Sequence, residues 1–201
     1  MSYQILGPTP IGMADNRDFT RVLAPLRLWP HTPDGHSYFL YFVPAYFVAD
    51  PVYDPGVPSS ERFIAKTGKF FTKIFLPRHR FDLRVMGILH ALVLALALFL
   101  CLRALRNQAG WVRISAAALM LWMWTDVMYV QQFSTAYSDA GAVVALGLVF
   151  SIALTVLLTR RGNSIKWVFA FAAVSCFLLG TKLQHAPAIA PLAAFSLMMA
   201  V

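Results

Sequence analysis

The sequence predicts an all-α fold: a polytopic integral membrane helical bundle with a large external N-terminal loop that contains an interfacial amphipathic helix. Composition is the first reason, because 59% of the 201 residues are hydrophobic, whereas soluble domains average about 45–50% apolar residues. The second is position: apolar runs approaching the roughly 20 residues that cross a bilayer occur only after residue 84. The chain therefore divides into an external (periplasmic) loop region, 1–84, and a transmembrane region, 85–201.

Within the loop region, residues 15–26 are expected to form a short helix, and residues 38–48 a strand or an aromatic segment at the membrane interface. Residues 59–76 predict a membrane-parallel helix that Ser59 or Ser60 caps. Its apolar face carries Phe63, Phe70 and Ile74, and its other positions carry Arg62, Lys66, Lys69 and Lys73. This pattern favours a helix lying in the membrane plane; the alternative is a helix packed on the protein's own spans.

Five apolar segments are expected as transmembrane helices: about 85–105, 112–130, 140–159, 165–181 and 186–201. The connections after the first and third segments contain no acid and six cations: Arg103, Arg106, Arg113, Arg160, Arg161 and Lys166. The connection after the second contains Asp126 and Asp139 and no base. Because Lys and Arg accumulate in short cytoplasmic loops, the N-terminal region and the acidic connection are predicted to lie outside. One observation argues against this orientation: three cations, Arg78, Arg80 and Arg84, lie on the predicted outer side just before the first segment. Long segments, however, translocate largely regardless of charge.

An external N-terminal region needs a preceding span, and none lies before Met1 in the sequence. We therefore expect a piece of a longer membrane protein, without its first span and its C-terminal half. A naturally short protein with a translocated N-terminal region is the alternative.

The net charge of +8 fits cations that flank spans better than a nucleic-acid partner. Cys101 and Cys176 lie inside apolar runs, so neither a disulfide framework nor a metal site is predicted. The sequence has no Gly-rich phosphate loop, Walker pattern or zinc spacing, and no cofactor is predicted.

Asp15 and Asp18 are two of only nine acidic residues. An Asp-x-x-Asp pair is typical of a helix cap, but a carboxylate can also act as general base toward a hydroxyl. Other polar residues are predicted on the same outer side: Arg21, Asp126, Gln131, Gln132, Tyr137, Ser138, Asp139, Lys182, Gln184 and His185. Lys182 and His185 could hold a phosphate or end a helix by reaching water. His90, alone in an apolar span, is expected to be packed or partnered rather than a ligand.

Four segments carry a resemblance to a known family: 15–21 (DNRDFTR), 80–87 (RFDLRVMG), 129–139 (YVQQFSTAYSD) and 181–184 (TKLQ). They resemble the bacterial polyprenyl-phosphate-sugar-dependent glycosyltransferases of the GT-C fold, in which a catalytic Asp lies in the first external loop. The resemblance implies an inner-membrane enzyme of cell-envelope glycan biosynthesis. It would transfer a sugar, with inversion, from a lipid-linked phosphosugar to a glycan or lipid hydroxyl.

The resemblance also implies roles. Asp18 would be the catalytic base, with Asp15 next and Arg21 orienting Asp18, and Lys182 and His185 would bind the lipid phosphate. Further substrate-binding candidates are Asp126, Tyr137, Asp139 and Gln184. Partners would be membrane lipids, the polyprenyl-phosphate donor and the acceptor, and metal dependence is left open. Two alternatives remain: a transporter or flippase that uses the same residues as a substrate path, and a non-catalytic membrane scaffold.

Overall fold

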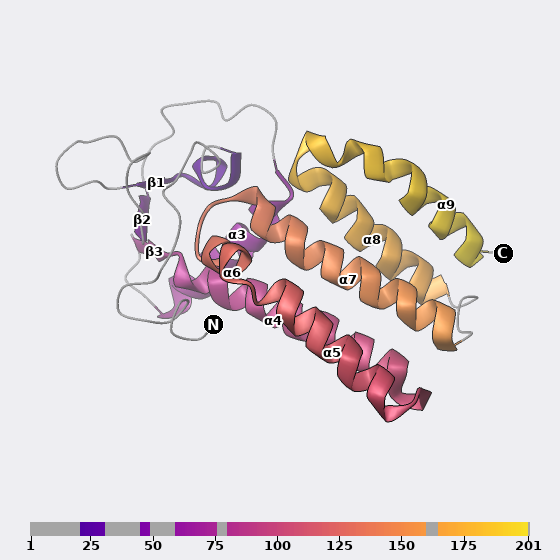
Figure 1. Cartoon of the computed structure of the whole chain (residues 1–201). Coiled ribbons are helices and arrows are strands. Elements are labelled where there is room, and N and C mark those ends of the chain that lie inside the picture. Colours follow the sequence, from indigo (N-terminus) through magenta and orange to yellow (C-terminus); the bar gives the residue numbers. More distant parts are fainter. Residues whose placement is uncertain (1–20, 31–44, 49–58, 76–79, 160–164, 201) are drawn as a thin grey trace. The chain divides into compact units, whose positions relative to one another are not determined.

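A computed structural model of the chain describes residues 21–30, 45–48, 59–75, 80–159 and 165–200 (Figure 1). The described part is mostly helical, as predicted, with one small sheet. The order of elements is η1 (Ala24–Leu26), β1 (Leu28–Pro30), β2 (Ala45–Val48), α3 (Glu61–Phe75), β3 (Arg80–Asp82), α4 (Arg84–Ala104), η3 (Leu105–Asn107), α5 (Gly110–Trp124), α6 (Val127–Phe133), α7 (Ser138–Thr159), α8 (Ile165–Thr181), η4 (Leu183–Ala188) and α9 (Ile189–Ala200).

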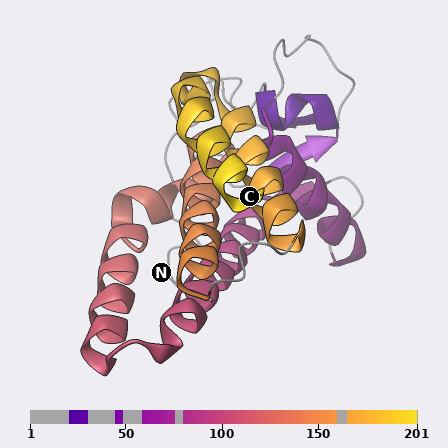
Figure 2. The same ribbon diagram turned by 90° about the vertical axis from the view of Figure 1, so that its right-hand side faces the viewer.

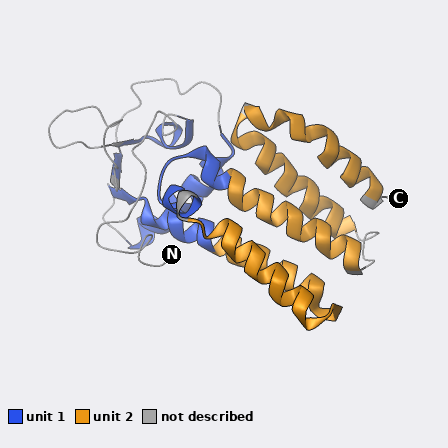
Figure 3. Cartoon of the chain, viewed as in Figure 1, with its two compact units in different colours: residues 1–91, 127–141 blue, residues 92–126, 142–201 orange. Residues whose placement is uncertain are grey.

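The chain forms two compact units, which Figure 3 distinguishes by colour. Unit 1 comprises Met1–Ala91 and Val127–Gly141, and unit 2 comprises Leu92–Asp126 and Ala142–Val201. The long helices α4 and α7 each begin in unit 1 and continue into unit 2. Each unit therefore contains segments that are far apart in the sequence.

Unit 1 contains a three-stranded antiparallel sheet of order β1-β2-β3. Trp29 pairs with Phe47, and Tyr46 pairs with Phe81. Tyr46 and Phe81 are almost fully buried. The all-α prediction did not include this sheet, although β2 falls in the segment for which a strand was one alternative. Of the helix expected at 15–26, only 21–26 is described, as two helical residues followed by η1.

Helix α3 confirms the helix expected at 59–76. Ser59 caps it, since its Oγ accepts a hydrogen bond from the Glu61 backbone N–H at 3.2 Å. Gly68 lies on the buried side, where an added Cβ would meet the Phe81 ring at 3.4 Å and the Val85 side chain at 3.5 Å. The missing side chain thus allows α3 to pack closely on β3 and the start of α4.

Unit 2 is built around α7, α8 and α9, which run side by side in both ribbon views (Figures 1 and 2). Its core consists of small and branched residues of α7 packed on Phe171 and Leu178 of α8. Phe195 of α9 closes this core, with its ring centroid 4.9 Å from that of Phe171. Gly147 brings α7 close to α5, because a Cβ there would lie 3.5 Å from the Trp124 ring.

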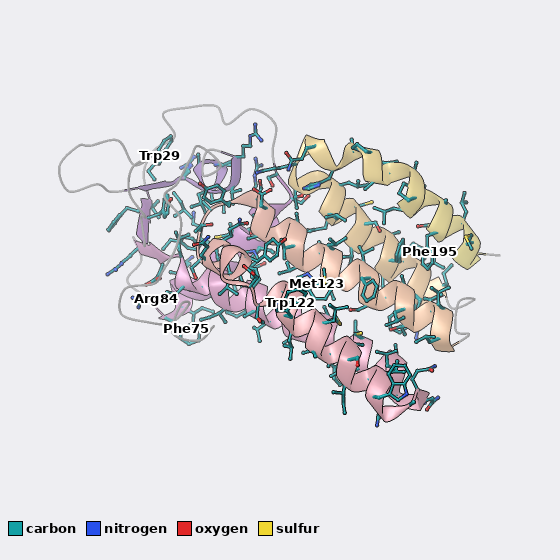
Figure 4. All side chains as sticks on the ribbon, in the orientation of Figure 1. Trp29, Phe75, Arg84, Trp122, Met123 and Phe195 are labelled. Atoms are coloured by element: carbon teal, nitrogen blue, oxygen red, sulfur yellow. The ribbon has the colours of Figure 1, made fainter. Side chains whose placement is uncertain are left out.

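Two described helices are long and apolar enough to cross a bilayer by length and composition: Arg84–Asn107, which includes η3, and Ser138–Leu158. The apolar helix α8 is shorter, with 17 residues. Unit 2 also exposes bulky apolar side chains, among them Trp122 and Met123 of α5 (Figure 4). An apolar exterior of this kind suits a lipid environment better than water.

The structure differs from the expected segment at 112–130. Helix α5 ends at Trp124 and α6 begins at Val127. At the break, the backbone N–H and the Oγ1 of Thr125 both donate to the Leu121 carbonyl, at 2.8 and 2.6 Å. The 15 residues of α5 extend only about 22 Å, which is less than the roughly 30 Å hydrocarbon core. The expected segment at 186–201 also divides, into the end of η4 and α9.

Candidate functional site

The two carboxylates predicted to be catalytic, Asp15 and Asp18, lie outside the described residues. The structure describes the chain from Arg21, whose side chain is exposed. The roles assigned to the acidic segment therefore remain predictions.

In unit 1, Tyr137 and Asp139 lie at the start of α7. Tyr137 is buried, and its backbone N–H donates to the Oγ1 of Thr135 at 3.2 Å. Asp139 is half-buried in the first turn of the helix, where a negative charge favours the helix dipole. Its position suits a helix start as well as a substrate contact.

In unit 2, the other candidates occupy two helix ends. Asp126 is exposed, in the break between α5 and α6. Lys182 separates α8 from η4, and the His185 backbone N–H donates to its carbonyl at 3.1 Å. Gln184 is exposed, whereas His185 is half-buried, and its Nε2 has no hydrogen-bond partner among the described residues. The structure thus brings Lys182 and His185 together in one tight turn.

Among the described residues of unit 1 is a fully buried polar pair that the sequence analysis did not identify. Glu61 of α3 and His90 of α4 are both fully buried, and Glu61 Oε1 lies 2.8 Å from His90 Nε2. The other ring nitrogen, Nδ1, lies 2.9 Å from the carbonyl oxygen of Phe133, the last residue of α6. The pair therefore ties together three segments that the sequence separates.

The geometry determines where the protons lie. A carbonyl oxygen only accepts hydrogen bonds, so Nδ1 of His90 must carry a proton. Nε2 then either accepts a proton from a neutral Glu61 or donates one to a charged Glu61. In both states a single proton lies between Glu61 and His90, and the pair as a whole has no net charge.

Burial raises the pKa of Glu61 above its usual value, because a buried carboxylate loses its hydration. The nearby His90 and the backbone of Gly141 oppose this shift by favouring the charged form. The second carboxyl oxygen, Oε2, is buried and makes no hydrogen bond within the described part of the chain. A buried oxygen without a hydrogen-bond partner typically lowers the folding stability by about 1–3 kcal/mol.

Sequence reasoning missed Glu61 because an acid in the first turn of a helix is ordinary. One signal was available: Glu61 shares a face with Ile64, Ala65 and Gly68 by three- and four-residue spacing, and that face is the buried one. The expectation that His90 is a packed or partnered residue is confirmed. Its partner lies 29 residues away in the chain, so no local pattern joins the two.

The chain was compared with curated proteins, solved structures and protein-family models. No curated protein and no solved structure matches the chain. A protein-family model described as the YfdI N-terminal transmembrane domain matches residues 2–201. This match and the apolar helices confirm the prediction of a membrane protein with transmembrane helices. Because the match covers nearly the whole sequence, the chain belongs to the YfdI N-terminal transmembrane domain family.

Proposed function

We propose that this domain is the membrane-embedded part of a GT-C type glycosyltransferase of the bacterial inner membrane. The enzyme transfers a sugar from a polyprenyl-phosphate donor to a hydroxyl of a glycan or lipid on the external face. The domain supplies the external loop with the catalytic carboxylate, together with the helices that hold the lipid-linked donor.

The position of the polar candidates is the observation that carries this proposal. Asp139 is in the first turn of α7, Lys182 directly follows α8, and Asp126 lies in the break between α5 and α6. When α7 and α8 cross the bilayer in opposite directions, the start of α7 and the end of α8 face the same side. A lipid-linked substrate with its sugar in water meets polar residues at that level.

The proposed reaction is a single displacement. Asp18 accepts the proton of the acceptor hydroxyl as its oxygen bonds to the anomeric carbon of the sugar. The bond between that carbon and the phosphate oxygen breaks, and the polyprenyl phosphate leaves. Lys182 and His185 stabilise the negative charge on the leaving phosphate, and Arg21 orients Asp18.

The test is Asp18→Asn in the full-length enzyme, with Asp15→Asn beside it and Asp50→Asn as a matched control from the same region. Transfer of labelled sugar from the lipid donor is measured in membranes, with and without a chelator of divalent cations, and insertion is measured by membrane fractionation. We expect Asp18→Asn to abolish sugar transfer while its membrane insertion stays normal. Asp50→Asn should retain sugar transfer. Full transfer by Asp18→Asn would refute the assignment of the base.

A second candidate function, a transporter or flippase, is favoured by the break at Thr125–Asp126. Transporters place substrate sites at discontinuous helices near the middle of the bilayer, and α5 is too short to span alone. The two functions separate in proteoliposomes. A flippase moves the lipid-linked sugar between leaflets without an acceptor and loses this activity with Asp126→Asn, whereas the enzyme consumes donor only when acceptor is present.

A further inference from the structure

Helix α3 presents three chemically different sides. One side is buried and consists of Glu61, Ile64, Ala65, Gly68 and Thr72. This side contacts β3 through Gly68 and reaches His90 through Glu61. Because these contacts fix the rotation of the helix about its axis, they also fix what its other sides present to the surroundings.

The side opposite the buried one is apolar and uncovered. Phe63, Phe70 and Ile74 are 71%, 64% and 59% exposed, respectively. Phe71 and Phe75, which lie on an adjoining side near the C-terminal end of α3, are exposed as well, and Figure 4 labels Phe75. A bulky apolar strip that the protein leaves uncovered marks a membrane or protein contact rather than a water-facing surface.

The third side is basic. Arg62, Lys66, Lys69 and Lys73 follow one another at three- and four-residue spacing, which places them along one stripe of a helix. Lys69 also joins α3 to η1, because its Nζ donates a hydrogen bond to the Leu26 carbonyl. No carboxylate among the described residues forms an ion pair with Lys69 or Lys73.

A further cation comes from the residue after Leu26. Partial burial and the positive charges of Arg27 and Lys73 hold the pKa of Lys69 below its usual value. Arg27 and Lys73 are therefore each close enough to repel the charge of Lys69, and the hydrogen bond from Lys69 to Leu26 places it beside Arg27. Mutual repulsion of this kind is relieved when an anion binds among the charges.

The backbone at Arg27 gives an independent indication. Arg27 is the C-cap of η1 and has φ 58° and ψ 41°, the left-handed conformation. Glycine adopts this conformation without a steric penalty, whereas other residues are strained by it. An arginine in this conformation lowers the folding stability relative to a glycine. A residue held in a strained conformation is a candidate functional residue.

We propose that Arg27, Lys69 and Lys73 bind the phosphate of an anionic phospholipid, while the exposed side of α3 formed by Phe63, Phe70 and Ile74 enters the acyl-chain boundary. A basic stripe beside a bulky apolar strip is the pattern of a helix held in a membrane interface. Anionic headgroups supply the complementary charge, and each Lys or Arg near such a surface strengthens binding by about fivefold. This site does not depend on the proposed sugar transfer.

The affinity arm of the test uses the full chain in a neutral detergent, with phosphatidylglycerol and phosphatidylcholine as competing probes in native mass spectrometry. We expect preferential binding of phosphatidylglycerol, weakened by about fivefold in each of Arg27→Gly, Lys69→Gln and Lys73→Gln. The controls are Arg113→Gln and Lys166→Gln, which remove exposed cations of unit 2 and should change this preference little. Arg27→Gly separates binding from folding, because glycine relieves the backbone strain and should leave the thermal midpoint equal or higher.

The insertion arm uses Phe70→Trp in nanodiscs whose lipids carry bromine on the upper acyl chain. The fluorescence of the added tryptophan is obtained by subtracting the fluorescence of the wild type, which has five tryptophans. This fluorescence should be quenched more in phosphatidylglycerol than in phosphatidylcholine. Equal affinity for the two lipids, equal losses in the unit 2 controls, or absence of quenching at residue 70 would overturn the proposal. Displacement of the lipid by millimolar inorganic phosphate would also overturn it, by assigning the cations to a soluble phosphate ligand.

Discussion

Replacing Glu61 with methionine and His90 with leucine tests whether the buried pair stabilises unit 1 as a unit. Removing one partner of a buried charged pair typically costs about 3–5 kcal/mol. In Glu61→Met, this cost is partly offset, because the unpaired Oε2, which costs about 1–3 kcal/mol, disappears as well. The difference of the central values predicts that Glu61→Met destabilises the protein by about 2 kcal/mol.

His90→Leu should cost more than Glu61→Met. It leaves Oε1 of Glu61 and the Phe133 carbonyl without the partner that His90 supplies, while Oε2 stays buried and unpaired, so nothing offsets the loss of about 3–5 kcal/mol. The double variant removes both polar groups of the pair and leaves only the Phe133 carbonyl. Its cost should fall at least about 2 kcal/mol below the sum of the two single costs.

The assay is equilibrium unfolding in mixed micelles of a mild detergent with increasing sodium dodecyl sulfate, followed by helical circular dichroism. All four proteins of the double-mutant cycle are measured in the same detergent, so that differences in the unfolded state largely cancel. Ile152→Ala, a buried apolar truncation of α7 in unit 2, serves as a control that should not couple to either change. Additive single costs, within about 0.5 kcal/mol, would show that Glu61 and His90 do not stabilise each other.

Two further predictions concern α3. Because burial raises the pKa of Glu61 above its ordinary value of 4.5, the folded state binds that proton more tightly than the unfolded state. This contribution to stability is fully present below that ordinary value and is lost as pH rises through the folded pKa. The unfolding midpoint of the wild type should decrease as pH rises through this range, whereas that of Glu61→Gln should not. An identical pH dependence of the two midpoints would contradict the raised pKa of Glu61. At Gly68, alanine should be tolerated, because its Cβ would meet Phe81 at 3.4 Å, whereas leucine should cost about 1–3 kcal/mol by overpacking; equal unfolding midpoints for the two variants would contradict close packing there.

The long apolar helices could be predicted well from the sequence. Helices α4, α7 and α8 begin and end within about two residues of the expected segments, because a continuous apolar run is a local signal that tertiary contacts rarely override. The break after Trp124 could not be predicted from the sequence, because neither a glycine nor a proline lies there. Thr125 ends the helix by donating its hydroxyl and its N–H to one carbonyl, and threonine does the same inside unbroken helices, as Thr155 does in α7.

The sheet and the buried pair were hidden for a different reason. Strands β1 to β3 have three or four residues each, too few for an alternating pattern to stand out. Glu61 and His90 each look ordinary in their own segments, as a first-turn acid and as an isolated polar residue in a span. Only the fold, which brings α3 against α4 and the end of α6, makes them a pair.

The pair and the exposed faces of α3 are consequences of the same rotation of one helix. Successive residues of an α-helix turn by about 100°, so turning Glu61 toward His90 also turns Phe63 and Phe70 away from the protein. Near the other end, the hydrogen bond from Lys69 to the Leu26 carbonyl holds the basic stripe beside Arg27. A buried carboxyl at the first turn and a lysine two turns later therefore define one orientation, in which apolar and cationic side chains are available to a bilayer at the same time. On the proposed membrane contact, this gives a reason why α3 begins with a fully buried acid: the acid itself would not touch lipid, but its contact with His90 sets which residues of the helix are exposed.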